Sequence, residues 1–141
     1  MREILFRGKQ VDNGEWVYGF YVRIGKSHFI FTGKLKIVGL NVDFECYEVI
    51  PDTVGQFTGL TDKNGKKIFE SDIVKTQLNA CLLKMIDYTV VSFDGGAFGL
   101  LWKRCGLSGG VEQFTAFTSI CNTEYEVVGN IYDNPELLEA D

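Results

Sequence analysis

Apolar side chains occupy every second position from Trp16 to Ile24, with Tyr18, Phe20 and Val22 between these two residues. A period of two is typical of a β-strand, because its side chains point alternately to the two faces of a sheet. We therefore expect a strand that buries this apolar face. The opposite face would carry Val17, Gly19, Tyr21 and Arg23.

Short strands joined by turns are expected along the whole chain, because it has sixteen glycines and only two prolines. A turn at Asn13-Gly14 and another at Gly25-Lys26 flank the strand described above. Asn64-Gly65 predicts a tight two-residue turn. Strands are expected at 5–11, 15–24, 28–32, 37–50, 59–62, 67–70, from 71 onward, and at 85–93, 98–102 and 124–132.

Helical character is weak. Residues 77–84 have a helical composition and are expected to form a loop or one helical turn between strands. Residues 105–110 predict a glycine-rich loop, and 111–121 fit either a short amphipathic helix or an irregular strand. Asn134 followed by Pro135 and Glu136 predicts a short C-terminal helix with an N-cap, a first-turn proline and an acid.

The expected fold is therefore mainly β, with small antiparallel sheets or a partly open barrel in one or two closely packed subdomains and a short C-terminal helix. At 141 residues and 45% hydrophobic, the chain suits a single domain over 1–141, with possible subdomains at 1–50 and 51–141.

The charge of the chain bears on its partners and location. A formal net charge of -5 disfavours purely electrostatic binding of nucleic acid, because such binding depends on Lys and Arg. The densest basic run, at 63–67, is expected to be a solvated hairpin tip. No signal peptide and no apolar run of membrane-spanning length is visible, so we expect a cytoplasmic protein that does not bind membranes.

Residues with metal or nucleotide chemistry are sparse. The cysteines Cys46, Cys81, Cys105 and Cys121 form no C-x-x-C pair, so they predict reduced and mostly buried thiols. His28 is the only histidine and is expected to pack, half-buried, in a strand. The run at 19–27 has five residues between its glycines where a phosphate-binding loop needs four. No metal and no cofactor is expected.

Four acids cluster between residues 50 and 74, namely Asp52, Asp62, Glu70 and Asp72. A pair of carboxylates can serve as acid and base, but carboxylates beside turns more often accept backbone hydrogen bonds. The polar residues Thr53, Gln56 and Thr58 are expected to tie down an irregular loop. We therefore predict a protein that is not an enzyme.

Residues 50–74 read IPDTVGQFTGLTDKNGKKIFESDIV. This phrase resembles the core motif of the YopX-like proteins of phages and prophages. The start of the chain (R-E-I, F-R and G-E-W-V-Y-G within residues 2–19) and the end (YEVVGNIYDNPELL, 125–138) are similar to two further motifs of that family, in the same order. Candidate motif residues are Pro51, Thr53, Gly55, Gln56, Gly59, Asn64, Gly65, Asp72, Gly129, Asn130 and Pro135.

One position departs from the family pattern. Ser71 stands where the family has glycine, in E-S-D-I-V. If the backbone needs a positive φ there, a serine costs about 1 kcal/mol or more, and the local turn could differ.

The resemblance implies a mostly β, phage- or prophage-encoded protein, often oligomeric, with no known catalytic residues. Aromatic residues, including Trp16, Tyr21 and Phe31, exceed what one face of a small sheet buries, which favours self-association. The first hypothesis is a non-enzymatic interaction protein, a homo-oligomer acting on a host or phage protein. It predicts a large apolar patch outside the core.

Two other hypotheses remain open. The first is a nucleic-acid-associated accessory factor, with a small barrel that uses strands from 72–91. It predicts that Lys34, Lys36, Lys63, Lys66 and Lys67 lie on one face. The second is a small enzyme that uses the acids of 52–72. It predicts a concave pocket holding a carboxylate of perturbed pKa.

Overall fold

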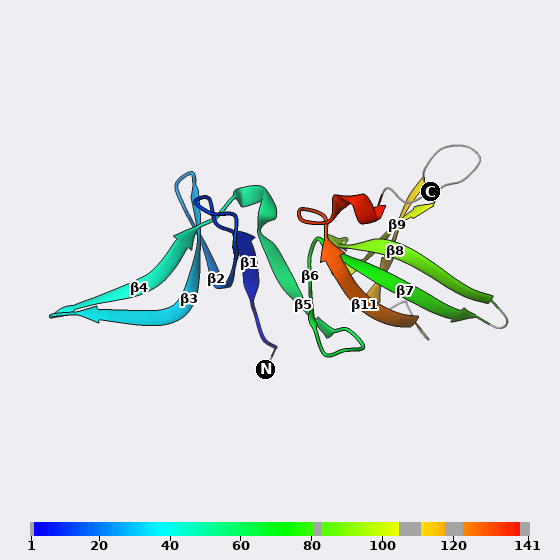
Figure 1. Ribbon diagram of the computed structural model, residues 1–141, viewed down its shortest axis with the longest axis horizontal. Coiled ribbons are helices and arrows are strands. Elements are labelled where there is room, and N and C mark those ends of the chain that lie inside the picture. The colour runs from blue at the N-terminus through cyan, green and yellow to red at the C-terminus, as the bar shows by residue number, and fades with distance from the viewer. Residues whose placement is uncertain (1, 81–82, 105–110, 118–122, 139–141) are drawn as a thin grey trace. The chain divides into compact units, whose positions relative to one another are not determined.

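The computed structural model describes residues 2–80, 83–104, 111–117 and 123–138. Within these ranges the protein is mainly β, with two antiparallel sheets, short 3-10 turns and no α-helix (Figure 1). The chain divides into two compact units, Met1–Gly59 and Leu60–Asp141, and each has its own core. No helical segment in the described ranges has the length and apolar character to cross a bilayer.

The first sheet has the strand order β4-β3-β2-β1-β5-β6. Its strands are β1 (Phe6–Lys9), β2 (Trp16–Ile24), β3 (Ser27–Val38), β4 (Asn41–Glu48), β5 (Gly55–Thr61) and β6 (Lys67–Phe69), with a 3-10 turn η1 (Pro51–Thr53) before β5. The two glycine turns around β2 are therefore where the sequence predicts them. Pro51 ends the extended run before it, as expected of a residue without an N–H donor.

The core of the first unit lies on one face of β1 to β4. Val17, Ile30 and Val49 are buried there, and Phe6, Tyr21, Tyr47 and Val54 pack against them. Two backbone hydrogen bonds join the chain after β4 to the end of β1. The Ile50 N–H donates to the Lys9 carbonyl at 2.8 Å, and the Val11 N–H donates to the Glu48 carbonyl at 3.0 Å.

The predicted burial of β2 is wrong in its choice of face. Val17 and Gly19 are buried and Tyr21 is half-buried, whereas Tyr18, Phe20, Val22 and Ile24 are exposed. Gly19 explains the choice, because its backbone packs so closely under β3 that a Cβ there would lie 1.9 Å from the Phe31 carbonyl oxygen. The face of β2 that carries Val17 and Gly19 is thus the one that is buried in the core.

Residues 37–50 do not form one strand. β3 continues through Gly33 to Val38, and the chain then turns at Gly39 and Leu40 into β4. Gly39 has φ +64°, which suits a tight turn, whereas Gly33 lies in a bulge of β3 between Phe31 and Leu35. The result is a hairpin much longer than expected.

The second sheet has the order β10-β9-β8-β7-β11. Its strands are β7 (Asp72–Ala80), β8 (Leu83–Asp94), β9 (Ala97–Arg104), β10 (Val111–Ala116) and β11 (Thr123–Asn130). Ile68, Val74, Val91, Leu100 and Val127 form the core of this unit.

Two expectations for the second unit change, and for the described residues of 111–121 the structure decides between the two alternatives left open by the sequence. The described residues of 77–84 belong to β7 and β8, because strand pairing overrides their weak helix preference. Residues 111–116 are a strand, and the C-terminal helix is a single 3-10 turn, η3 (Pro135–Leu138). The two described sheets form no closed barrel. The loop predicted at 105–110 lies outside the described residues.

Candidate interaction surface

The motif residues of the first unit build the start of β5. Thr53 is buried, and its hydroxyl donates to the Ile50 carbonyl at 2.6 Å and accepts from the Lys9 N–H at 2.9 Å. Gly55 and Gln56 then lie opposite Arg7 and Phe6 in the ladder with β1. Gly59, which has φ +88°, lies further along the same strand. These residues shape backbone and present no converging polar groups.

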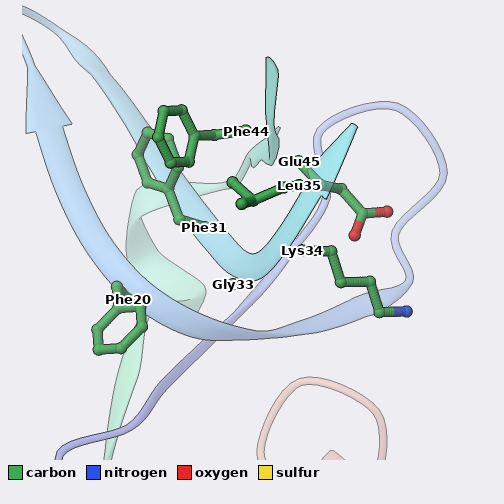
Figure 2. Close-up of a pocket in the computed structure, with 7 residues that line it drawn as sticks. All are labelled: Phe20, Phe31, Gly33, Lys34, Leu35, Phe44 and Glu45. Carbon is green, nitrogen blue, oxygen red and sulfur yellow. The ribbon is translucent and has the colours of Figure 1, made fainter. Parts of the chain in front are cut away.

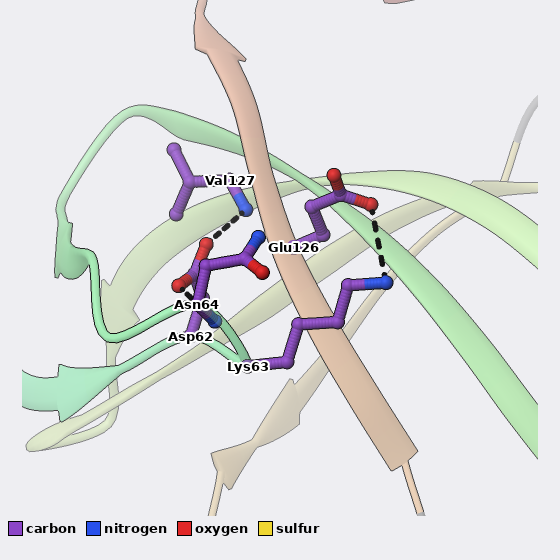
Figure 3. Close-up of polar contacts among 5 residues, drawn as sticks. All are labelled: Asp62, Lys63, Asn64, Glu126 and Val127. Atoms are coloured by element: carbon purple, nitrogen blue, oxygen red, sulfur yellow. Dashed lines mark hydrogen bonds and ion pairs between the residues drawn. The ribbon is translucent and has the colours of Figure 1, made fainter.

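The Asn64-Gly65 turn is longer than a two-residue turn and closes around the carboxylate of Asp62 (Figure 3). This carboxylate is buried. It accepts the N–H groups of Asn64 and Lys66 at 2.9 Å each and the N–H of Val127, in β11, at 3.0 Å. Lys63 adds an ion pair to Glu126 at 3.5 Å. The turn is thereby fastened to β11.

The pKa of Asp62 reflects two opposing effects. Burial alone would raise it, but the N–H donors of Val127, Lys66 and Asn64, together with the charge of Lys66, lower it below the ordinary value. The carboxylate therefore stays ionised and serves as a structural acceptor.

The remaining motif residues meet in the second unit. Asp72 lies opposite Asn130 in the ladder of β7 and β11, and its carboxylate accepts the Phe69 N–H at 2.8 Å. The Asn130 side chain accepts the N–H groups of Tyr132 and Asp133 at 3.0 and 2.9 Å. A Cβ on Gly129 would lie 2.4 Å from Asn134 Oδ1. Gly129 thus leaves room for the Asn134 side chain, and Asn130 holds the turn that precedes Pro135.

Residues singled out for chemistry have packing roles in the described part of the chain. His28 is half-buried and its Nδ1 is hydrogen-bonded to the Tyr21 hydroxyl. No group of three or more metal-ligating side chains occurs among the described residues. Cys46 is exposed, contrary to expectation, and the other three cysteines lie outside the described residues.

An apolar surface on the first unit includes residues of β2 that the sequence analysis expected to be buried. We call it the outer face. It is the face of β2, β3 and β4 that points away from the core. Its exposed members are Tyr18, Phe20, Val22, Ile24, Leu35, Ile37, Val42 and Phe44, and Phe29 and Phe31 lie half-buried among them.

Strand register makes the outer face continuous. Side chains that are directly opposite in a ladder lie on the same face of the sheet. Phe20 lies opposite Phe31, and beyond the bulge the pairs Leu35 with Phe44 and Ile37 with Val42 follow. At the other end of β2, Trp16 is covered by the Arg7 guanidinium, 4.5 Å from its ring centre. The outer face therefore runs from β2 to the hairpin tip.

The outer half of the hairpin is a two-stranded ribbon, which we call the arm (residues 32–45). The β2 pairing of β3 ends at Phe31, and Figure 1 shows the ends of β3 and β4 extending away from β2. On the reverse side of the arm Lys36 lies opposite Asp43. The arm is therefore amphipathic, with one apolar and one charged side.

An open pocket of about 600 Å³ lies on the outer face where β3 bends at Gly33 (Figure 2). Its apolar walls are Phe20, Phe31, Leu35 and Phe44, and Lys34 and Glu45 stand at its rim. The Glu45 carboxylate accepts the hydroxyls of Thr32 and Tyr47 at 2.6 Å each.

These hydroxyls and the charges of Lys34 and Lys36 hold the pKa of Glu45 below its ordinary value. The rim thus carries one charge of each sign, and the pocket can receive an apolar group.

A signal for the arm is present in the sequence. Leu35 and Ile37 alternate with lysines, Val42 and Phe44 alternate with acids, and Gly39 stands between the two runs. That mirror pattern is typical of an amphipathic hairpin.

Comparison with known proteins agrees with this fold. The crystal structure of protein EF1440 from Enterococcus faecalis matches with a TM-score of 0.60 and 23% identity, over 98% of this chain and 99% of that one. No curated protein matched. The family model described as YopX protein matches residues 5–139. The chain therefore belongs to the YopX family.

Proposed function

We propose that this chain is a non-enzymatic, homo-oligomeric interaction protein of a phage or prophage, and that it assembles through the outer face. The assembled protein would act on a host or phage protein in the bacterial cytoplasm. The observation that carries the proposal is the amphipathic arm, whose apolar side lies in solvent in a single chain while its reverse side carries Lys36 and Asp43.

The size of the outer face supports an interface. Phe20, Ile37 and Phe44 are 62%, 75% and 66% exposed. Together with the other five exposed members they present on the order of 900 Å² of side-chain surface. Monomeric proteins rarely expose an apolar patch of more than a few hundred Å², and a stable interface buries about 800 Å² from each partner.

A second copy of the chain fits this surface better than a charged partner. The exposed members that define the outer face are apolar and include no Lys or Arg, so they offer nucleic acid no phosphate contacts. A two-fold interface uses the same patch on both subunits, and one apolar patch on each copy meets that requirement. An isolated two-stranded ribbon is marginal in water, so packing of the arm against another copy would also stabilise it.

Size-exclusion chromatography with light scattering tests the proposal on a double variant, Phe20→Thr with Phe44→Thr. Both side chains are mostly exposed, and threonine retains a preference for strands, so the fold should persist. We expect the wild type to elute as an oligomer and the double variant as a monomer, with unchanged circular dichroism.

The matched control is Lys36→Thr with Asp43→Thr, which changes two residues on the reverse side of the same arm. This variant should remain oligomeric. Equal oligomer masses for both double variants would refute the assignment of the interface to the outer face.

A further inference from the structure

The tip of the arm carries an unusual residue. Leu40 is fully exposed in the turn between β3 and β4. Turns of this kind normally use Gly, Asn, Asp or Ser, because their side chains are solvated or bond the backbone. Leucine contributes nothing of that sort to the turn, whose backbone requirement is met by Gly39 at φ +64°. Its apolar side chain is therefore better explained by a contact outside its own chain.

The pocket at the bend of β3 supplies a matching cavity on the same hairpin. Its walls are the apolar side chains of Phe20, Phe31, Leu35 and Phe44, and it is open to solvent on one side. Leu40 is four residues from Phe44, roughly 13 Å along a strand, so it cannot fold back into the pocket of its own arm.

We infer that Leu40 of one copy inserts into the pocket of a second copy, and that the second copy returns the same contact. This inference rests on the proposed self-association and specifies its geometry. Leu40 and the pocket have the same separation in both copies, so a two-fold axis between antiparallel arms satisfies both insertions at once.

The charges around the tip are compatible with this contact. Residues 37–42 read IVGLNV and contain no ionisable group. Lys34 and Glu45 remain at the rim of the pocket, where they keep access to solvent. Insertion of the tip therefore buries apolar side chains without burying an unpaired charge.

Cross-linking tests the geometry on the full chain. Cys46 lies opposite Phe31, a wall of the pocket, and is exposed. In the variant Leu40→Cys, a short bis-maleimide should join Cys46 of one copy to the cysteine introduced at position 40 of another. A mixture of ¹⁴N- and ¹⁵N-labelled protein, analysed by peptide mass spectrometry, separates links between copies from links within one. We expect heavy–light pairs of the peptides containing positions 40 and 46.

Sedimentation equilibrium provides the second readout. Leu40→Asn should weaken self-association by at least about tenfold, because each dimer loses two buried leucines. It should leave the fold intact, because Gly-Asn suits a tight turn. The control Val38→Asn changes another exposed apolar residue, at the base of the turn and on the side of the arm that carries Lys36, and should have little effect.

The outcomes separate the two proposals. An oligomeric wild type whose affinity is unchanged by Leu40→Asn, or which gives no heavy–light link between those peptides, overturns this inference and leaves the self-association proposal standing. A wild type that is monomeric at all concentrations overturns both.

Discussion

Ser71 adopts a left-handed backbone conformation, with φ +70°, and is the one non-glycine residue in the described ranges with a positive φ. The turn keeps its geometry because both backbone groups are paired, the N–H to the Val91 carbonyl at 2.8 Å and the carbonyl to the Ile131 N–H at 3.0 Å. Serine therefore carries a conformational cost that glycine would not.

The variant Ser71→Gly should raise the free energy of unfolding by up to about 1 kcal/mol, as measured by urea denaturation. Ser71→Ala is the control, since it removes the hydroxyl but keeps the Cβ that disfavours positive φ. A gain in stability for the alanine variant equal to that of the glycine variant would contradict this explanation.

Ionisation of Asp62 should contribute to the stability of the second unit, because its buried carboxylate accepts three backbone N–H groups. In Asp62→Asn the amide nitrogen cannot accept the N–H groups that the carboxylate accepts, so we expect a loss of about 2 kcal/mol in the free energy of unfolding at pH 7. Asp94→Asn, an exposed substitution at the end of β8 in the same unit, should be nearly neutral.

The pH dependence follows from the lowered pKa of Asp62. A carboxyl group with a depressed folded-state pKa contributes its full stability above the unfolded pKa of about 3.9, and the contribution is lost as pH falls through the folded value. The difference in stability between wild type and Asp62→Asn should therefore be constant from pH 7 to about pH 5 and shrink below pH 4. A difference that shrinks around pH 6 would point to another group.

At the scale of the elements, strand positions were largely predictable because alternation and glycine turns are local signals. The buried face of β2 was not predictable, because both of its faces carry apolar residues. Contact between Gly19 and β3 decides which face is covered, and that contact joins residues distant in sequence. The sequence also predicted that aromatic side chains would be left exposed for self-association, but it did not predict that they lie on the outer face. The arm forms only because β3 continues through Gly33, where a break between two strands was expected.

Packing of β2 on β3 gives a prediction. Gly19→Ala should lower the free energy of unfolding by at least about 2 kcal/mol, because the new Cβ would overlap the Phe31 carbonyl. Gly25→Ala is the control. Gly25 has φ +62°, and no atom lies within 4 Å of the position that a Cβ would take there, so this variant should show only the conformational cost of about 1 kcal/mol. Equal losses in thermal denaturation would show that close approach is unimportant.

At the scale of the whole molecule, the nucleic-acid alternative makes a separate prediction. It requires exposed lysines that bind phosphate, whereas Lys63 is paired with Glu126 and the chain carries a net charge of -5. We expect no change in the fluorescence anisotropy of labelled single-stranded DNA with up to micromolar protein at low salt. Binding that weakens steeply with added salt would favour the alternative.

The central claim is that a second copy buries the outer face, and the molar mass in solution tests it most directly. The chain has a mass of 15.9 kDa. Sedimentation equilibrium of the wild type at micromolar to hundred-micromolar concentrations should give an apparent mass that rises with concentration and reaches at least that of two chains at the upper end. A constant mass of one chain across that range would contradict the account.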